Sequence, residues 1–371
     1  MVCRDAGRDG PLDIAADIRE AWTPRSAVYR DSRIHELLID RAFARSWQLA
    51  PEAAEALAPG EARPFTLLEG SLDEPLLLTR DESGDLHCLS NVCTHRGNLV
   101  VPGACRAKVL RCGYHGRRFG LDGRFLSMPE FDEARGFPAR TDDLPELGLE
   151  RWGPLAFTGI APACPIEDWL GAVRARVGWL PFDEFRLDTT TSRDYTVAAN
   201  WMLYCDNYLE GFHIPFVHEA LTTALDYGAY TTETFDHGSL QLGIAARGAA
   251  AFEPPGGHPD AGRAVAGYYF WLFPNLMLNF YPWGLSANLV QPLAVDRTRV
   301  RFFDYVWRAE RRGAGAGTDL HRVELEDEAV VKNVQRGVRS RLYERGRYSP
   351  TQEIGVHHFH RLLARSLADA A

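Results

Sequence analysis

The chain has 371 residues, a formal net charge of −9 and 46% hydrophobic residues, so it is long enough for two domains with substantial cores. The negative charge and the lack of long basic runs argue against nucleic acid as the main partner. No secretion signal and no apolar run approaching about 18 residues is present, so we expect neither export nor a membrane span.

Seven cysteines are present, an odd number. A disulfide framework is therefore not expected, which is consistent with a reducing compartment, and we expect the protein in the cytoplasm. Two of the cysteines belong to a motif described below. The other five are interpreted as ordinary free thiols: Cys3, Cys88, Cys105, Cys164 and Cys205.

The chain is expected to begin with a separate segment and a helix, over residues 1–45. Its first dozen residues carry almost no apolar content and are expected to fray. Apolar positions at helical spacing follow over residues 33–49, and these predict a helix before the first domain.

Short strands and turns dominate from about residue 64, and we place an all-β domain at residues 46–158. Two strands, 75–79 and 86–89, are predicted on either side of a polar turn. Two more, 118–121 and 124–126, flank an Asp-Gly pair that is a typical hairpin signal.

Two residue pairs lie in predicted loops of this domain, Cys93 with His95 and Cys112 with His115, and 16 residues separate His95 from Cys112. Cys-x-His followed by Cys-x-x-His is the pattern of a Rieske 2Fe–2S centre, in which two Cys hold one iron and two His hold the other. A tetrahedral zinc site with two Cys and two His is the alternative. Zinc sites usually place their sulfurs in a short C-x-x-C hook, so the pattern favours the cluster.

A second domain of mixed character is expected over residues 159–371. Helices are predicted at 166–180 and 319–345, and strands at 192–200, 268–273, 276–281, 285–293 and 298–307. Loops are predicted at 249–262 and 311–317. The fold class is therefore α+β, with helices against an antiparallel sheet.

A second candidate site begins at Asp206. Asp206, Glu210 and His213 are four and three residues apart, so on a helix they share one face. Pro215 should end or kink that helix and could let His218 converge on His213. Two His and a carboxylate with open positions are typical of non-haem Fe(II) oxygenases. Alone, such a His pair is more often an ordinary core or surface feature, but the neighbouring cluster motif favours iron.

The chain resembles the catalytic α subunit of Rieske non-haem iron oxygenases, the ring-hydroxylating oxygenase family, along nearly its whole length. Three matches carry the resemblance: the cluster motif, Asn200-Trp201 leading into the His213–His218 segment, and Glu326-Asp327-Glu328 followed by Val334-Gln335-Arg336-Gly337. The resemblance implies an N-terminal Rieske domain and a helix-grip (START-like) catalytic domain.

The resemblance also implies the third iron ligand. Family members have an Asp on a late helix upstream of a Val-Gln pair, and that position corresponds to Asp327. Glu324, Glu326 and Glu328 are close in sequence, and their alternative interpretation is a solvated helix face. Asp206 is a candidate supporting carboxylate.

Family members are usually trimers in which one subunit's cluster faces its neighbour's iron, with a carboxylate between them. Glu210 occupies that position and would contact His115 of the neighbouring subunit and its own His213. Many members have Asp there, so Glu is a departure from the common pattern. The alternative is that Glu210 forms only a surface pair.

The implied reaction uses O₂ and electrons from NADH or NADPH, delivered by a separate reductase or ferredoxin. The implied cofactors are the 2Fe–2S cluster and mononuclear Fe(II). No Gly-rich nucleotide motif occurs in the chain, which supports a separate reductase. A plain electron carrier, or a helix-grip binding protein with a degenerate iron site, is the non-enzyme alternative, but all three candidate ligands are present.

Within the family, Glu210 and its surrounding sequence are most similar to the choline, carnitine and betaine oxygenases. We therefore expect hydroxylation or N-demethylation of a quaternary ammonium compound, whose cation aromatic faces would hold. Nine aromatic residues are candidates for that cage, although most are expected to pack in the core: Phe212, Phe216, Tyr227, Tyr230, Trp271, Phe273, Phe280, Tyr281 and Trp283. The alternative is mono- or dioxygenation of an aromatic ring. A carboxylate in the pocket favours the cation, and a wholly apolar pocket favours the ring.

Overall fold

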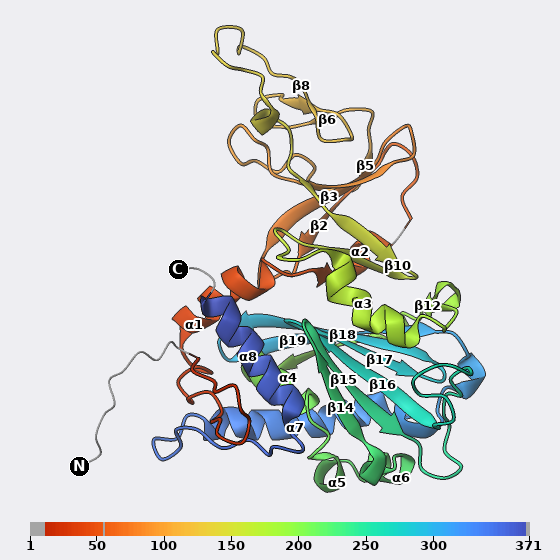
Figure 1. The fold of residues 1–371 in the computed structure, drawn as a ribbon. Helices are drawn as coiled ribbons and strands as arrows, with labels where there is room; N and C mark the ends of the chain where they lie inside the picture. The colour runs from red at the N-terminus through yellow and green to blue at the C-terminus, as the bar shows by residue number, and fades with distance from the viewer. Residues whose placement is uncertain (1–11, 55, 369–371) are drawn as a thin grey trace. The chain divides into compact units, whose positions relative to one another are not determined.

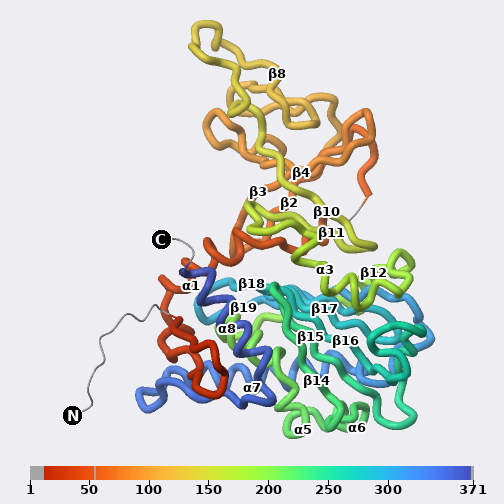
Figure 2. Tube along the Cα trace, in the orientation of Figure 1, coloured from red at the N-terminus to blue at the C-terminus, as the bar shows by residue number. Residues whose placement is uncertain are grey.

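The computed structural model describes residues 12–54 and 56–368, and their contacts divide the chain into two compact units. One unit is Trp47–Pro162, and the other combines the residues up to Ser46 with those from Ala163 onward (Figures 1 and 2). The N-terminal segment thus belongs to the same unit as the C-terminal domain. The boundaries predicted after residues 45 and 158 stay predictions, and the predicted frayed start, with Cys3, lies outside the described residues.

The Trp47–Pro162 unit consists mainly of short antiparallel strands, orange to yellow-green in Figure 2. Its three sheets have the strand orders β1-β11-β10, β5-β2-β3-β4-β9 and β6-β7-β8. The strands are β1 (Gln48–Leu49), β2 (Glu61–Leu67), β3 (Glu74–Arg80), β4 (Leu86–Ser90), β5 (Cys105–Arg106), β6 (Leu110–Arg111), β7 (Arg118–Phe119), β8 (Phe125–Ser127), β9 (Glu146–Leu147), β10 (Leu149–Trp152) and β11 (Leu155–Thr158). Two short helices accompany them, α2 (Pro51–Ala54) and η2 (Arg140–Asp142).

Both strand pairs predicted in this unit are confirmed. β3 pairs with β4, and β7 pairs with β8 across Asp122-Gly123. Leu77, Leu89 and Phe119 form part of a buried core that also contains Cys93 and Cys112. The two cysteines are therefore held by the packed interior of the unit.

The other unit is built on an eight-stranded antiparallel sheet. Its order is β12-β19-β18-β17-β16-β15-β14, and β13 also pairs with β19. The strands are β12 (Arg186–Leu187), β13 (Arg193–Val197), β14 (Thr231–Phe235), β15 (Gly238–Ile244), β16 (Val265–Leu272), β17 (Leu276–Tyr281), β18 (Gly284–Ala294) and β19 (Arg297–Val306). The strands predicted between 268 and 307 are confirmed with small changes at their ends.

Helices pack against this sheet, which confirms the α+β prediction (Figure 1). α8 contacts β14 and β15, while α4 contacts both β18 and α7. The helices are α1 (Ser32–Leu38), η1 (Ile39–Phe43), α3 (Ile166–Val177), η3 (Phe182–Glu184), α4 (Trp201–Tyr208), α5 (Ile214–Val217), α6 (Glu219–Ala224), η4 (Tyr227–Ala229), η5 (Ala309–Arg311), η6 (Gly315–Gly317), α7 (Leu320–Gly337) and α8 (Ile354–Ala368). Among the described residues no helix has the length and apolar character needed to cross a membrane.

Two predicted helices are shorter than their apolar spacing indicated. The first is α1 followed by the π-helical turn η1, and the chain then enters β1, where Gln48 pairs with Thr158. The second, α7, ends at Gly337, and Leu342 beyond it is 99% exposed. Apolar residues at helical spacing predict a helix only where the apolar face packs against other parts of the protein. Strands β14 and β15 and helix α8 were not predicted.

Candidate metal centres

The two cluster-motif loops have the same backbone geometry. In the first, the Gly97 N–H donates to the Cys93 carbonyl at 2.9 Å, and in the second Gly116 donates to Cys112 at 3.1 Å. Each glycine has a positive φ, +70° and +74°, which glycine adopts without strain. The Cys93 N–H also donates to Asn98, as that of Cys112 does to Arg117, both at 2.8 Å. Because the same tight turn occurs in both loops, each loop presents one thiol and one imidazole.

The four side chains are arranged as a Rieske cluster requires. The Cys93 and Cys112 thiols are buried, whereas the two imidazole rings reach toward solvent with their centroids 4.8 Å apart. Backbone N–H groups of His95 and Tyr114 point at the sulfurs, and the Asn98 side-chain amide lies 3.5 Å from the Cys112 Sγ. Hydrogen bonds to the sulfurs help set the potential of such clusters. The donor set therefore fits a 2Fe–2S cluster.

A buried arginine ties the two loops together. Arg117 is 2% exposed and pairs with Asp142 at 2.6 Å, and its guanidinium lies 4.9 Å from the centre of the Phe125 ring. The hydroxyl of Thr94, in the first loop, donates to the Asp142 carbonyl at 2.8 Å. Asp142 thus contacts both loops. Arg117 and Asp142 were not predicted from the sequence, because nothing in their spacing distinguishes them.

In the unit that contains the eight-stranded sheet, the helix that was expected to carry Asp206, Glu210 and His213 on one face ends earlier. α4 stops at Tyr208, so the prediction of one continuous helix is wrong. The chain turns at Gly211, where a Cβ atom would lie only 2.6 Å from the Tyr230 ring. The close packing of Tyr230 therefore requires glycine at this turn.

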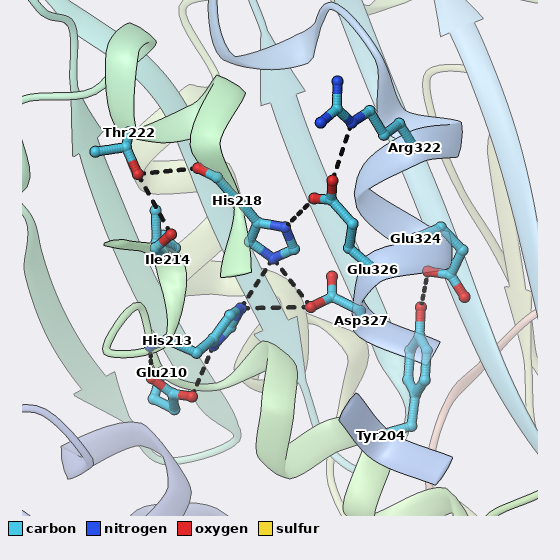
Figure 3. Close-up of polar contacts among 10 residues, drawn as sticks. All are labelled: Tyr204, Glu210, His213, Ile214, His218, Thr222, Arg322, Glu324, Glu326 and Asp327. Carbon is cyan, nitrogen blue, oxygen red and sulfur yellow. Dashed lines mark hydrogen bonds and ion pairs between the residues drawn. The ribbon is translucent and has the colours of Figure 1, made fainter. Parts of the chain in front are cut away.

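His213 and His218 flank the short helix α5, in whose first turn Pro215 is accommodated. Figure 3 shows the two imidazoles pointing toward each other and toward Asp327, which projects from α7. The Nε2 atoms of the two rings are 3.1 Å apart, and the Asp327 Oδ1 lies 3.0 Å from the Nε2 of His218 and 3.4 Å from that of His213. Three donor atoms thus converge within 4.8 Å, which fits a single metal ion.

The other nitrogen of each ring has its own carboxylate. The Nδ1 of His213 is 2.7 Å from Glu210, and that of His218 is 2.8 Å from Glu326. Arg322 in turn holds Glu326 at 2.9 Å (Figure 3). Such outer carboxylates orient metal-binding imidazoles and keep Nε2 free for the metal. Glu326, interpreted from sequence as part of a solvated face, is therefore part of the site.

The electrostatics of the site favour a cation among these groups. Burial favours the neutral forms, but hydrogen bonds with Asp327 and Glu210 raise the pKa of His213 to about 9. Likewise, burial opposes ionisation of Asp327, yet the two imidazoles hold the pKa of its carboxyl below its usual range. With both imidazoles neutral, as metal binding requires, the three carboxylates outnumber the one neighbouring cation, Arg322, and a metal ion would balance the remaining negative charge.

Contacts between helices α4 and α7 bring these distant residues together. The backbone N–H of Asn200 donates to Gln335 Oε1 at 2.8 Å, while the Asn200 side chain caps α4 at Met202 N. One turn along α4, the Tyr204 hydroxyl donates to Glu324 at 2.6 Å. The two sequence motifs, Asn200-Trp201 and Val334-Gln335, therefore meet and fix the position of Asp327.

The remaining acidic candidates have separate contacts. Glu328 pairs with Lys332 on the same helix. Asp206 accepts a hydrogen bond from Tyr29 at 3.0 Å and lies 2.8 Å from His360. Its role as a supporting carboxylate stays a prediction, and these partners place it in a network beside the N-terminal segment.

A cavity opens beside the convergent side chains. Its walls combine tyrosine rings, aliphatic side chains and a few polar groups: Tyr204, Asn207, Tyr208, Glu210, His213, Ile214, His218, Leu221, Leu225, Tyr230, Gln241, Tyr269, Asn279, Tyr281, Ser286, Asn288, Phe302, Ala316, Leu320, Val323, Glu324 and Asp327. Of the nine aromatic candidates, Tyr230 and Tyr281 line it. Phe212 and Phe216 are exposed instead. Four further aromatic residues line the cavity but were not among the candidates from the sequence: Tyr204, Tyr208, Tyr269 and Phe302.

Two family models match the chain. The model described as "Ring hydroxylating alpha subunit (catalytic domain)" matches residues 181–369, and the one described as "Rieske [2Fe-2S] domain" matches residues 46–138. Between them they include the motif residues of both sites.

Two characterised relatives align along almost the whole chain. Choline monooxygenase (chloroplastic) of Arabidopsis thaliana is 30% identical, over 96% of this chain and 85% of its own length. The carnitine monooxygenase oxygenase subunit of Escherichia coli (strain K12) is 28% identical, over 97% of each chain.

Solved structures share the fold. A quaternary ammonium Rieske monooxygenase superimposes with a TM-score of 0.75 at 24% identity, over 97% of this chain and all of that one. Naphthalene 1,2-dioxygenase from Rhodococcus sp. gives 0.69 at 19% identity, over 96% of this chain and 97% of its own. The same architecture therefore occurs in both of these solved enzymes.

Proposed function

Because the chain belongs to the ring-hydroxylating α-subunit family and carries a Rieske [2Fe–2S] domain, it is an oxygenase, and we propose that its substrate is a quaternary ammonium compound. The supporting observation is the cavity, which is lined by tyrosines and also by the carboxyl groups of Glu210, Glu324 and Asp327, of which Glu324 is buried. A quaternary nitrogen offers no hydrogen-bond donor, so aromatic faces and negative charge are what can hold it. The relatives named for choline and carnitine support the same class.

We assign the two metal sites on the donor sets described above. Cys93, His95, Cys112 and His115 would hold the 2Fe–2S cluster, and His213, His218 and Asp327 the mononuclear iron. When bound, the cluster supplies single electrons and the iron supplies O₂ activation. The protein's own part is to orient both imidazoles through Glu210 and Glu326, and to hold the substrate carbon in the cavity beside Asp327.

The overall reaction inserts one oxygen atom into a C–H bond next to the quaternary nitrogen. The other oxygen atom leaves as water, and one NADH with one proton supplies the two electrons and balances the equation. A carbon hydroxylated in this way releases an aldehyde if the C–N bond then breaks. We propose NADH or NADPH as the donor, acting through a separate reductase or ferredoxin.

Glu210 is proposed as the bridge for electron transfer between subunits. It contacts His213 twice, through the backbone N–H at 3.0 Å and the ring Nδ1 at 2.7 Å, and its side chain lies at the cavity wall. The proposal requires a neighbouring subunit whose His115 reaches Glu210, which a trimer would provide. We propose a cytoplasmic location for this assembly.

The test is NADH-driven O₂ uptake by the holoenzyme with a surrogate reductase. Choline, carnitine and glycine betaine are compared with benzoate and naphthalene, with products identified by mass spectrometry and hydrogen peroxide measured to detect uncoupled turnover. Oxidised amine or released aldehyde in proportion to O₂ consumed supports the proposal. Coupled turnover on the aromatic compounds alone would show that the cavity is a ring-binding site.

A further inference from the structure

One buried carboxylate in the cavity is neither a candidate metal ligand nor the outer carboxylate of a candidate ligand. Glu324 lies on α7 one turn before Asp327 and is 3% exposed. Its Oε2 accepts the hydrogen bond from Tyr204, and its Oε1 is buried with no hydrogen-bond partner among the described residues. A buried carboxylate with an unused oxygen is costly unless something compensates it.

The charged and titratable groups around Glu324 do not neutralise it. On its own helix, Asp327 and Glu328 are acidic, and Lys332 is paired with Glu328. From α4 comes the Tyr204 phenol, and from β13 the Tyr195 phenol is within electrostatic reach. No ion pair joins Glu324 to a cation within residues 12–54 and 56–368. Its compensating charge must therefore come from outside the chain or from a proton.

Burial favours the protonated form of Glu324 in the empty cavity. It raises the pKa of Glu324 to about 8, although the Tyr204 hydrogen bond acts in the opposite direction. This value includes smaller contributions from Asp327 and Glu328, which raise the pKa, and from Lys332, which lowers it. A bound cation would favour the ionised carboxylate, because opposite charges at short range lower the pKa of an acid.

The position of Glu324 suits contact with a ligand. Glu324 and Tyr204 line the same cavity as His213 and Asp327. Four more tyrosines line it as well: Tyr208, Tyr230, Tyr269 and Tyr281. Tyr204 fixes one carboxylate oxygen and leaves the other without a protein partner. The cavity thus holds one buried carboxyl group with an unused oxygen among several aromatic residues.

We propose that Glu324 is the counter-ion of the substrate's quaternary nitrogen, and that it makes the cavity select a cation over a neutral molecule of the same shape. This inference rests on the proposed function, because it presupposes a quaternary ammonium substrate. Glu324 would act through charge alone, since a quaternary nitrogen cannot donate a hydrogen bond. Tyr204 is then a positioning residue that holds the carboxylate.

The experiment compares choline with 3,3-dimethylbutan-1-ol, in which carbon replaces nitrogen and the charge is lost. Affinities are measured by anaerobic calorimetry on wild-type holoenzyme, on Glu324→Gln and on the control Glu328→Gln, which changes an acid of the same helix. Wild type and control are expected to prefer choline. Glu324→Gln is expected to lose choline affinity by about 10- to 100-fold, the scale for truncating a buried charge pair, and to keep its affinity for the neutral alcohol.

The outcomes separate this inference from the proposed function. If Glu324→Gln keeps the wild-type preference for choline, Glu324 is not the counter-ion, although the proposed substrate class stands. If wild type binds neither choline nor carnitine but binds naphthalene, the proposed function itself fails. Cluster absorbance and iron content verify folding of each variant.

A second variant covers the case in which Glu324→Gln does not fold. Glu324→Asp keeps the charge but withdraws it by one methylene, so the preference for choline is expected to fall several-fold while affinity for the alcohol holds. An unchanged preference in Glu324→Asp would overturn the counter-ion role.

Discussion

The two metal sites of this protein are assembled in opposite ways. The proposed cluster site comes from two loops whose proposed ligands lie between residues 93 and 115, and each loop is closed by its own backbone hydrogen bonds. The mononuclear site joins His218 to Asp327 across 109 positions of sequence and depends on the contact between α4 and α7. The first is local in the chain, and the second exists only when two helices pack correctly.

Because they are assembled differently, the two sites should be sensitive to substitutions at different places. The cluster loops can be damaged mainly through their own ligands or through Arg117 and Asp142, which join them. The mononuclear site can also be damaged from the far end of α7, where Gln335 meets Asn200. Variants chosen at these points should affect one site and leave the other intact.

The largest expected effect is on the cluster. Cys112→Ser should remove the visible absorption of the 2Fe–2S cluster, because a serine hydroxyl is a poor replacement for a buried thiolate ligand. The mononuclear iron should remain, at one iron per chain. Cys105→Ser is the matched control, since this thiol is exposed and outside the motif, and it should keep full colour. A coloured Cys112→Ser variant would refute the ligand assignment.

Asp327→Ala makes the complementary change in the catalytic unit. We expect iron to fall from three to two per chain and turnover to vanish, while the cluster spectrum persists. Glu328→Gln, one residue along the same helix but paired with Lys332, should keep all three irons. Metal analysis and absorption spectra distinguish these outcomes. Loss of both signals in Asp327→Ala would mean that Asp327 supports the fold and is not a ligand.

Glu210→Gln tests the proposed bridge. It removes a charge but keeps the shape, so both metals should stay bound while turnover falls by about 10- to 100-fold, the range for outer partners of ligating histidines. Single-turnover measurements should locate the defect in re-oxidation of the cluster. A normal rate would rule out the bridging role.

Gln335→Leu probes the helix contact that positions Asp327. The buried N–H of Asn200 would lose its acceptor, at a cost of about 1–3 kcal/mol. We expect a lower melting temperature and weaker iron binding, with the cluster absorption unchanged. Val334→Ala, at the exposed neighbouring position, serves as the control. Equal loss of both metals would contradict the independence of the two sites.

The smallest expected effect is a pH dependence of the stability of the Trp47–Pro162 unit. Burial favours neutral His87, but hydrogen bonds with Glu146 and Asp81 outweigh it and raise the pKa of the imidazole. A raised folded-state pKa stabilises the fold below the unfolded value of about 6.5, and this stabilisation is lost as the pH rises through the folded value. Solvent screening should keep it under about 1 kcal/mol. Unfolding followed by cluster absorbance, in wild type and His87→Asn from pH 5.5 to 8.5, measures the difference.

The Rieske domain could be predicted from sequence because the proposed cluster ligands, their spacing and the adjoining glycines are close together in the chain. His213 and His218 could be proposed as iron ligands in the same way, the resemblance pointed to Asp327 on α7, and the structure brings these three side chains together. The main strands of the large sheet were also predictable, because long alternating or apolar runs leave few other conformations. These features depend on neighbours in the chain and are therefore visible in it.

Only the tertiary structure decided how the acidic residues divide their roles. Within five residues of α7, Glu324 faces Tyr204, Glu326 faces His218, Asp327 faces both imidazoles and Glu328 faces Lys332. The end of α4 at Tyr208 and the close packing of Tyr230 against Gly211 beyond it were likewise not predicted, because they involve residues distant in the chain. Composition and spacing specify which groups are present, whereas burial and distant partners specify what each group can do.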